Sequence, residues 1–199
     1  MITLLYSGNF GLGHDLDTIL KGLHVLNGDG DRLKVLLVGN GKGLVGTLKL
    51  IEDLALRDVE LRPPVPLNEL PALLASGDIH IVAQKPLTEG LIVPSKIYGT
   101  LAAGRPVVFI GPPHCEVAQI VRDSGCGFIV APGDIASAKD ALRQLAGDAE
   151  LRQSMGERAR RYYAEHLGRK RSVGKIVTLI EQVGRNGHTV CPADANAVS

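Results

Sequence analysis

Short apolar runs rich in valine, isoleucine and leucine alternate along this chain with longer stretches whose apolar residues recur at helical spacing. The predicted strands are residues 2–7, 34–38, 59–62, 79–83, 106–110 and 127–130. The helices predicted between them are residues 15–26, 43–56, 67–75, 94–103 and 116–124. Strands and helices that alternate in this way are typical of a parallel sheet. We therefore predict an α/β fold with a doubly wound, six-stranded parallel sheet.

After the last predicted strand, the pattern changes to helical spacing alone. Three further helices are predicted there, at residues 134–146, 150–166 and 170–183. The final residues have no apolar period, which is typical of a loose tail. A length of 199 residues suits one well-buried domain and is short for two. We predict a single domain over residues 1–184 and a flexible tail over residues 185–199.

The carboxyl edge of the predicted sheet is where a doubly wound fold binds its ligand. That edge consists of the loops at residues 8–14, 39–43, 63–66, 84–95 and 111–115. Glycine is concentrated in them, as Gly8, Gly11, Gly13, Gly39, Gly41, Gly43, Gly90 and Gly111. A missing side chain lets a ligand approach the backbone, although tight turns need glycine as well. A single glycine could serve a tight turn or a ligand equally well, but so many glycines on one edge of the sheet favour a binding site.

The stretch from Pro94 to Gly111 predicts a short helix followed by a buried strand. Pro94 suits the first helical position, and Gly104 suits a left-handed stop. Lys96 then lies in the first turn, where a cation costs a few tenths of a kcal/mol because the helix dipole is positive there. A bound phosphate would reverse that sign, since free amides and an ammonium group would both face it. The alternative is a lysine that swings into solvent.

The loop from Gly8 to His14 follows the first strand, and its amides could form an anion-binding nest. It lacks the lysine and hydroxyl residue of a Walker sequence and the third glycine of a dinucleotide fingerprint. Asp15 is expected to cap the next helix, and its charge would repel a phosphate on that terminus. The anion is therefore expected to lie nearer to the helix that starts at Pro94. His14 could donate to a phosphate or to a sugar hydroxyl.

Three other loops at this edge carry candidate residues. Val38 and Gly39 stand where nicotinamide binding would require an acidic residue, so that function is not expected. The segment Arg62–Pro66 forms either a flat edge for a nucleobase or only a rigid corner. Glu89 precedes the Pro94 helix, and a carboxylate beside a phosphate can accept hydrogen bonds from sugar hydroxyls. A surface glutamate without a role is the alternative.

Charge and composition limit the classes of partner. Lysine and arginine number 22 against 21 acidic residues, so no overall field attracts nucleic acid. Aromatic residues make up 4% of the chain, too few for base-stacking platforms. Basic residues gather near the last two helices, where they either contact anionic lipid or form a solvated face. They are Arg158, Arg160, Arg161, Arg169, Lys170 and Arg171.

The cysteines and the apolar runs indicate the compartment. Cys115, Cys126 and Cys191 show no metal-ligand spacing, so no metal site is expected. Their odd number is typical of reduced thiols in an intracellular protein. The sequence shows no signal peptide and no apolar run long enough to span a membrane. We expect a cytoplasmic protein, with peripheral contact to the inner face of the membrane as a further option.

Taken together, several motifs resemble one enzyme family. They are the first glycine loop, the proline-bearing loop after the third strand, and the Pro94-Ser95-Lys96 helix that ends in Ala-Ala-Gly-Arg-Pro-Val. The fourth is the motif at residues 150–165 of a predicted helix, which contains Glu-Leu-Arg, Met-Gly, Ala-Arg and Tyr-Tyr in that order and ends in Glu165. The chain is similar in these motifs to the C-terminal half of a retaining, group 1 (family 4) glycosyltransferase of the GT-B architecture. The resemblance covers about residues 2–184 and is most specific from Pro94 to Gly111.

This resemblance implies a Rossmann-like half that binds a nucleotide diphosphate sugar, such as a UDP- or GDP-sugar, without a metal. It places the diphosphate between the first loop and Lys96, the base at the Arg62–Pro66 loop, and the sugar near Glu89. Glu89 and Lys96 would take the catalytic roles. The expected donor-binding residues are Gly8, Asn9, Phe10, Gly11, Gly13, His14, Gly39, Gly41, Arg62, Pro64, Val65, Gly90, Leu91, Pro94, Ser95 and Gly99.

Two positions depart from the family pattern. Gly99 stands where members commonly have a glutamate that grips the ribose, and the first loop lacks the usual arginine or lysine. The resemblance therefore implies either weak donor binding or a ribose held by the backbone. It also implies an N-terminal acceptor-binding domain, from a longer chain or a separate one, which would dock on the last helix. Synthesis of polysaccharide or another glycoconjugate is the expected role. Two alternatives stay open: a non-catalytic nucleotide-binding or partner-docking module, and an enzyme like the UDP-sugar 2-epimerases.

Overall fold

The computed structural model describes residues 1–30 and 33–186. Its centre is a six-stranded sheet with the order β3-β2-β1-β4-β5-β6, and every neighbouring pair is parallel. The strands are β1 (Thr3–Ser7), β2 (Lys34–Val38), β3 (Val59–Arg62), β4 (Ile79–Ala83), β5 (Val107–Ile110) and β6 (Gly127–Val130). The prediction of a doubly wound parallel sheet is confirmed. The strand order reverses between β1 and β4, which is the point where such sheets bind ligands.

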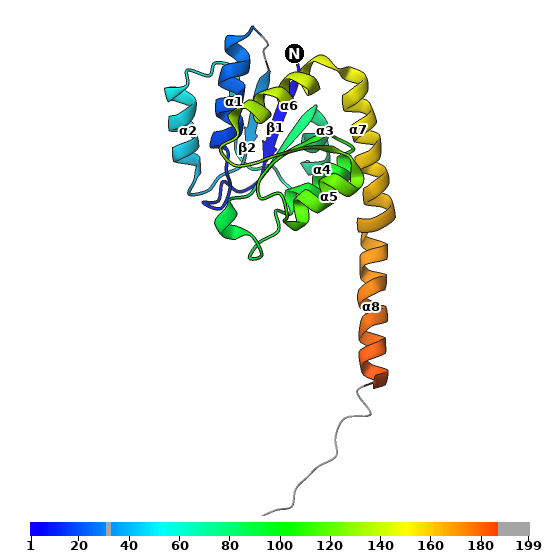
Figure 1. Cartoon of the computed structure of the whole chain (residues 1–199). Helices are drawn as coiled ribbons and strands as arrows, with labels where there is room; N and C mark the ends of the chain where they lie inside the picture. The colour runs from blue at the N-terminus through cyan, green and yellow to red at the C-terminus, as the bar shows by residue number, and fades with distance from the viewer. Residues whose placement is uncertain (31–32, 187–199) are drawn as a thin grey trace, which may run out of the picture.

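Helices cover both faces of this sheet (Figure 1). They are α1 (Asp17–Gly28), α2 (Leu44–Asp53), α3 (Leu70–Ser76), α4 (Lys96–Ala103), α5 (Glu116–Ser124), α6 (Ile135–Gly147), α7 (Ala149–Tyr162) and α8 (Arg169–Asn186). A 3₁₀ turn at Pro86–Thr88 and a π-helical turn at Tyr163–Leu167 add to the predicted elements. The central strand β4 is buried at every residue, as expected for a strand with helices on both sides.

Two main apolar clusters hold the helices to the sheet. On one face, Leu4 and Tyr6 of β1 pack with side chains of α1 and α6. On the other face, Val82 and Phe109 pack with side chains of α4, α5 and α7. Apolar side chains that point to opposite faces of one strand therefore bury both helix layers.

Most helix boundaries differ from the prediction by a few residues; α7, for example, ends at Tyr162, where the π-helical turn begins, rather than at residue 166. Helix α4 begins at Lys96 rather than at Pro94, because the carbonyls of Pro94 and Ser95 accept short-range bonds from the amides three residues on. Helix α3 begins at Leu70 rather than Leu67, after a turn. Helix α2 stops at Asp53, since Ala55 adopts a φ of 48° that no α-helix tolerates. The predicted left-handed stop at Gly104 is confirmed, with φ 65°.

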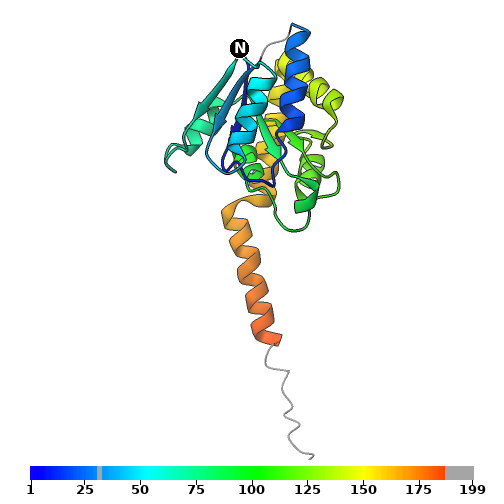
Figure 2. The same cartoon turned by 90° about the vertical axis from the view of Figure 1, so that its left-hand side faces the viewer.

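Helix α8 extends away from the rest of the molecule (Figures 1 and 2). Its apolar side chains are about half exposed or more, from 47% at Val177 to 65% at Ile180. Within the described ranges, no helix is both long and apolar enough to cross a bilayer. Residues 185–186 belong to α8, and the rest of the predicted tail, residues 187–199, lies outside the described residues.

Candidate functional site

The first glycine loop is joined to the loop after β2 by backbone hydrogen bonds. The amide of Gly8 donates to Val38 O, and the amide of Phe10 donates to Asn40 O at 2.7 Å. In return, the amide of Gly43 donates to Phe10 O at 2.7 Å. These bonds give the first loop a fixed shape without any ligand.

Gly39 and Gly41 make this contact between the two loops sterically possible. A Cβ atom at Gly39 would lie 1.9 Å from Gly8 O, and one at Gly41 would lie 2.3 Å from Asn9 Oδ1. Both residues also have φ 142°, a conformation that side chains disfavour. The structure therefore places these two glycines beneath the first loop, as its support. Direct contact of either with a ligand stays a prediction.

Lys96 bridges the start of α4 and the first loop. Its Nζ lies 3.4 Å from Asn9 O and 4.8 Å from the centre of the Tyr6 ring. Its side chain also crosses Gly8, where an added Cβ would lie 2.9 Å from Lys96 Cε. The Tyr6 hydroxyl donates to the same Asn9 carbonyl at 2.9 Å. The half-buried lysine is thus held over the glycine loop, in contrast to the alternative in which it swings into solvent.

The environment of Lys96 is suited to an anion. Burial lowers the pKa of its ammonium group to about 8. The first turn of α4 contains no acidic residue, and Ser95 makes no side-chain cap. Within the described ranges, the amides of Ser95 and Lys96 have no protein acceptor. Two free amides and a partly desolvated cation at one helix start form a site that a phosphate would stabilise.

His14 closes the other side of the first loop. Its Nδ1 lies 2.7 Å from Ala83 O, so the neutral ring donates from Nδ1 and keeps Nε2 as an acceptor. Burial lowers the pKa of His14, and the positive charges of Lys96 and Lys85 lower it further, against the opposing effect of the Ala83 bond. A phosphate at this place would favour the protonated ring, which could then donate from Nε2 as well.

The loop after β4 is packed against the first loop. The amide of Lys85 donates to Gly13 O at 2.7 Å, and a Cβ at Gly13 would lie 3.0 Å from Thr88 Cγ2. Glu89 and Leu91 are exposed in this loop, and Gly90 between them has φ 74°. These three residues line a pocket of about 370 Å³ whose other wall is the start of α5. Glu89 thus lies near the proposed phosphate site but in a separate pocket from Lys96.

Two smaller pockets contain most of the other candidates. One of about 230 Å³ is lined by Gly8, Ser95, Lys96 and Gly99, together with residues of α3. The other, of about 260 Å³, is lined by Phe10, Gly11, His14, Lys42 and Lys85 among others. Pro94 is buried behind the start of α4. The structure thus gathers the candidates of the first and fourth loops at the carboxyl edge of β1 and β4.

The candidates after β3 are placed differently. Arg62 is exposed and pairs with Glu60, with 2.5 Å between Nε and Oε1. That pair and Lys34 hold the pKa of the Glu60 carboxyl at about 2. Pro64 is exposed, and Val65 packs on a small apolar cluster under the sheet edge. Arg62 is thus engaged within the protein, and contact of this loop with a base stays a prediction.

His80 is a structural residue beside the site for which the sequence suggested no role. It is buried, with Nδ1 2.9 Å from Thr100 Oγ1 and Nε2 2.9 Å from Leu74 O. Burial lowers its pKa to about 4, which keeps the ring neutral. The ring therefore links α3 to α4 below Gly99. Its partners lie on two other elements, so the sequence gives no direct signal of this contact.

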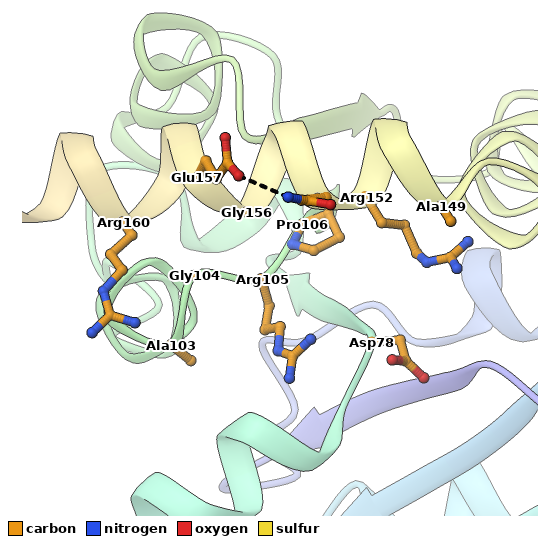
Figure 3. Close-up of a pocket in the computed structure, with 11 residues that line it drawn as sticks. Asp78, Ala103, Gly104, Arg105, Pro106, Ala149, Arg152, Gly156, Glu157 and Arg160 are labelled. Carbon is orange, nitrogen blue, oxygen red and sulfur yellow. Dashed lines mark hydrogen bonds between the residues drawn. The ribbon is translucent and has the colours of Figure 1, made fainter.

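A pocket of about 350 Å³ on the opposite edge of the sheet holds three arginines (Figure 3). Arg105 donates to Ala75 O at 2.5 Å, and Arg152 donates to Leu145 O and Ala146 O at 2.5 and 3.1 Å. Both side chains thus satisfy carbonyls in the last turns of α3 and α6. Helix capping thus accounts for two of the three arginines, and we place the functional site at the carboxyl edge, where the other candidates lie.

No group of three or more histidine, cysteine or acidic residues that could hold a metal ion occurs in residues 1–30 and 33–186. Cys115 and Cys126 are buried free thiols. That the protein uses no metal stays a prediction from the sequence. The groups that the structure offers to an anion are the cationic side chains around the first loop.

We expect anion affinity at this site to decrease as the pH rises. The Lys96 charge favours an anion and is lost above a pKa of about 8 in the empty protein, while His14 gains charge only as the pH falls. The dissociation constant for UDP, measured by calorimetry between pH 7 and 9, should rise by up to about tenfold per pH unit above the Lys96 pKa. The same series with Lys96→Met should be nearly flat, and an equally steep series in that variant would contradict the assignment.

Comparison with known proteins identifies related sequences. Residues 2–162 match the family model described as "Glycosyl transferases group 1". The chain is 30% identical over 142 residues to the putative colanic acid biosynthesis glycosyl transferase WcaI of Escherichia coli (strain K12), covering 71% of this chain and 34% of that protein. It is 28% identical over 153 residues to the N-acetyl-alpha-D-glucosaminyl L-malate synthase of Bacillus anthracis, covering 77% and 38%. The chain thus spans about a third of the length of these curated relatives.

Solved structures with the same fold include a mutant of S. aureus TarM in complex with fondaparinux, alpha-GlcNAc-glycerol and UDP. Its TM-score is 0.71 at 18% identity, over 89% of this chain and 35% of that one. The pneumococcal O-GlcNAc transferase GtfA, in complex with UDP and GlcNAc, gives a TM-score of 0.71 at 14% identity, over 92% and 36%. At these identities, the comparison shows a shared fold.

Proposed function

Because the chain belongs to the group 1 glycosyltransferases, we propose that it binds the nucleotide sugar donor of a glycosyl transfer reaction. The donor would be a nucleoside diphosphate sugar, such as a UDP- or GDP-sugar. One relative named for colanic acid biosynthesis supports a role in polysaccharide or glycoconjugate synthesis. The UDP in the structures of TarM and GtfA supports a nucleoside diphosphate as the ligand class.

The observation that carries this proposal is the position of Lys96. Its ammonium group lies over the glycine loop, at a helix start with two free amides and no acidic residue in the first turn. A diphosphate seated there would interact with charge from Lys96 and with N–H groups at the same place. These donors would stabilise the negative charge that grows on the diphosphate as it leaves the sugar. We therefore propose Lys96 as a catalytic residue.

The transfer itself would retain the configuration of the anomeric carbon. The bond from that carbon to the terminal phosphate oxygen breaks, and the acceptor hydroxyl oxygen forms the new bond. The hydroxyl proton passes to the departing phosphate, so charge and atoms balance. Glu89 would contact hydroxyl groups of the sugar from the loop after β4, since an ionised carboxylate accepts strong hydrogen bonds from them. With Lys96 stabilising the phosphate, this scheme includes no metal ion.

The acceptor would be bound outside this chain. The chain corresponds to about a third of the curated relatives, so we propose that a further domain of the glycosyltransferase supplies the acceptor site. We propose that this domain covers the carboxyl edge of the sheet, where the candidate residues lie. A cytoplasmic location and peripheral membrane contact stay predictions.

A thermal-shift series with nucleotides tests the proposed function. A ligand that binds only the folded state at 100 times its dissociation constant adds about 2.7 kcal/mol of stability. For a domain of this size that corresponds to about 5–10 °C in Tm. We expect UDP, GDP or ADP and the matching sugar nucleotides to give this shift, and uridine or guanosine to give none. If no nucleoside diphosphate shifts Tm at millimolar concentration, the proposal is wrong.

A non-catalytic nucleotide-binding module is the second candidate, and one residue favours it. Gly99 lines the pocket beside Lys96 without offering a carboxylate to a ribose. Such a module would bind the nucleotide but would not turn over a sugar nucleotide when the acceptor-binding part of a relative is added. Release of the nucleoside diphosphate from the sugar nucleotide under those conditions would exclude a non-catalytic module and support a glycosyltransferase.

A further inference from the structure

Gln84 is a buried polar residue at the end of β4, directly below the loop that carries Glu89. Its side chain is 1% exposed. The Nε2 group donates to Thr88 O at 3.1 Å and to Ile92 O at 3.0 Å. Its backbone amide donates to Ile110 O at 2.8 Å, which anchors the residue to the neighbouring strand. Both hydrogens of one side-chain amide thus bind the loop, from a fixed position in the sheet.

The two carbonyls that Gln84 binds bracket one short segment. Thr88 and Ile92 lie immediately before and after residues 89–91. That segment is exposed, with Leu91 at 79%, and Gly90 in it takes a left-handed φ of 74°. Its own turn is closed by the amides of Leu91 and Ile92, which both donate to Thr88 O. Among the described residues, these two bonds are the only side-chain hydrogen bonds that join the ends of the segment to the end of β4, and both are lost without Gln84.

The segment leaves one backbone donor and one carboxylate acceptor available to a ligand. In the part of the chain that the structure describes, the Gly90 amide has no protein acceptor. No atom lies within 4 Å of where a Gly90 Cβ would be, so the backbone there is open. The Glu89 carboxylate stands next to it on the same exposed turn. Gln84 lines the floor of the pocket of about 370 Å³ that this turn borders.

We propose that Gln84 is a positioning residue that holds the Glu89–Leu91 turn in the orientation needed to bind the sugar of the donor. It acts through the turn and does not touch the diphosphate, because Lys96 and the first loop lie in other pockets. This inference rests on the proposed function. It predicts that loss of Gln84 weakens recognition of the sugar and spares recognition of the nucleoside diphosphate.

The test uses Gln84→Met, which keeps the length of the side chain and removes both donors. Calorimetry measures the dissociation constants of UDP and UDP-glucose, and of GDP and GDP-mannose. We expect the ratio of the constants, sugar nucleotide over diphosphate, to rise at least fivefold in the variant, while the constant for the diphosphate alone changes by less than twofold. Hydrogen exchange of the amides of residues 91 and 92 should accelerate at least tenfold. The matched control is Gln119→Met, on the exposed face of α5, which should leave all four constants unchanged.

The outcomes separate this role from simple structural damage. If Gln84→Met weakens diphosphate and sugar nucleotide equally, or leaves their ratio unchanged, the positioning role is overturned while donor binding stands. If the unmodified protein binds none of the four ligands, the proposed function itself is overturned and the role of Gln84 with it. Unchanged amide exchange in the variant would also overturn the role, because the turn would then be held by other groups.

Discussion

Replacing Lys96 by methionine should weaken UDP binding by about 10- to 100-fold. The substitution keeps the aliphatic stem over Gly8 and Tyr6 and removes the ammonium group that faces Asn9 O. A charge-assisted hydrogen bond to phosphate contributes about 1.5–3 kcal/mol, which corresponds to that range of affinity. Calorimetry at pH 7 measures the change, since Lys96 is charged below its pKa of about 8.

Thermal unfolding of the free variant distinguishes this effect from misfolding. The charged lysine is disfavoured by its burial, so methionine at this position should leave the unliganded protein as stable as before or slightly more stable. Reduced affinity together with an unchanged or higher Tm would be specific to a binding role. Lys49→Met, on the exposed side of α2, is the matched control with the same change in net charge and should bind UDP normally. An unchanged dissociation constant in Lys96→Met would remove this residue from the site.

Gly39→Ala should be the most destabilising of the simple glycine substitutions at the carboxyl edge. The new Cβ would lie 1.9 Å from Gly8 O, and the hydrogen bond from the Gly8 amide to Val38 O holds this backbone in place. The φ of 142° adds backbone strain for any residue with a side chain. We expect a loss of about 3 kcal/mol or more in the free energy of unfolding, hence a Tm lower by about 6–12 °C.

The matched control for this substitution is Gly46→Ala on α2. No atom lies within 4 Å of its Cβ position, and alanine favours a helix interior over glycine by about 0.5–1 kcal/mol. The control should therefore unfold at the same or a higher temperature. Equal stability of Gly39→Ala and Gly46→Ala would show that the two loops are not packed as described. Chemical denaturation of both variants gives the same comparison if heating is irreversible.

The fold could be predicted from the sequence because its signals are local. The alternation of short apolar runs with helical periods predicted all six strands and their parallel pairing. The end of α4 could be predicted because glycine at position 104 readily adopts the left-handed conformation that ends a helix. Helix starts were less certain, since the carbonyls of Pro94 and Ser95 are bonded in tight turns that delay α4 to Lys96. Such turns depend on the packing of the loop that precedes α4, and no short sequence pattern specifies that packing.

The site could be predicted only in part. The juxtaposition of Lys96 with the first loop was expected because both lie at the carboxyl edge of the sheet and the family resemblance implies a diphosphate between them, and the structure places them together. The contacts of His80 and Gln84 were not expected, because each side chain bonds to backbone or hydroxyl groups that only the folded chain brings near. The ion pair of Arg62 with Glu60 was also missed, although its signal is local, because residues two apart on a strand share a face.

The backbone bonds among the loops after β1, β2 and β4 have a kinetic consequence for an incoming nucleotide. Since the amides of Gly8, Phe10 and Lys85 already donate to backbone carbonyls of neighbouring loops, the proposed phosphate site would be formed before a nucleotide arrives. Little ordering entropy is then lost on arrival, and capture need not wait for a rearrangement of the chain. Association rates should then differ little between sugar nucleotides, so that residence time would distinguish one sugar nucleotide from another.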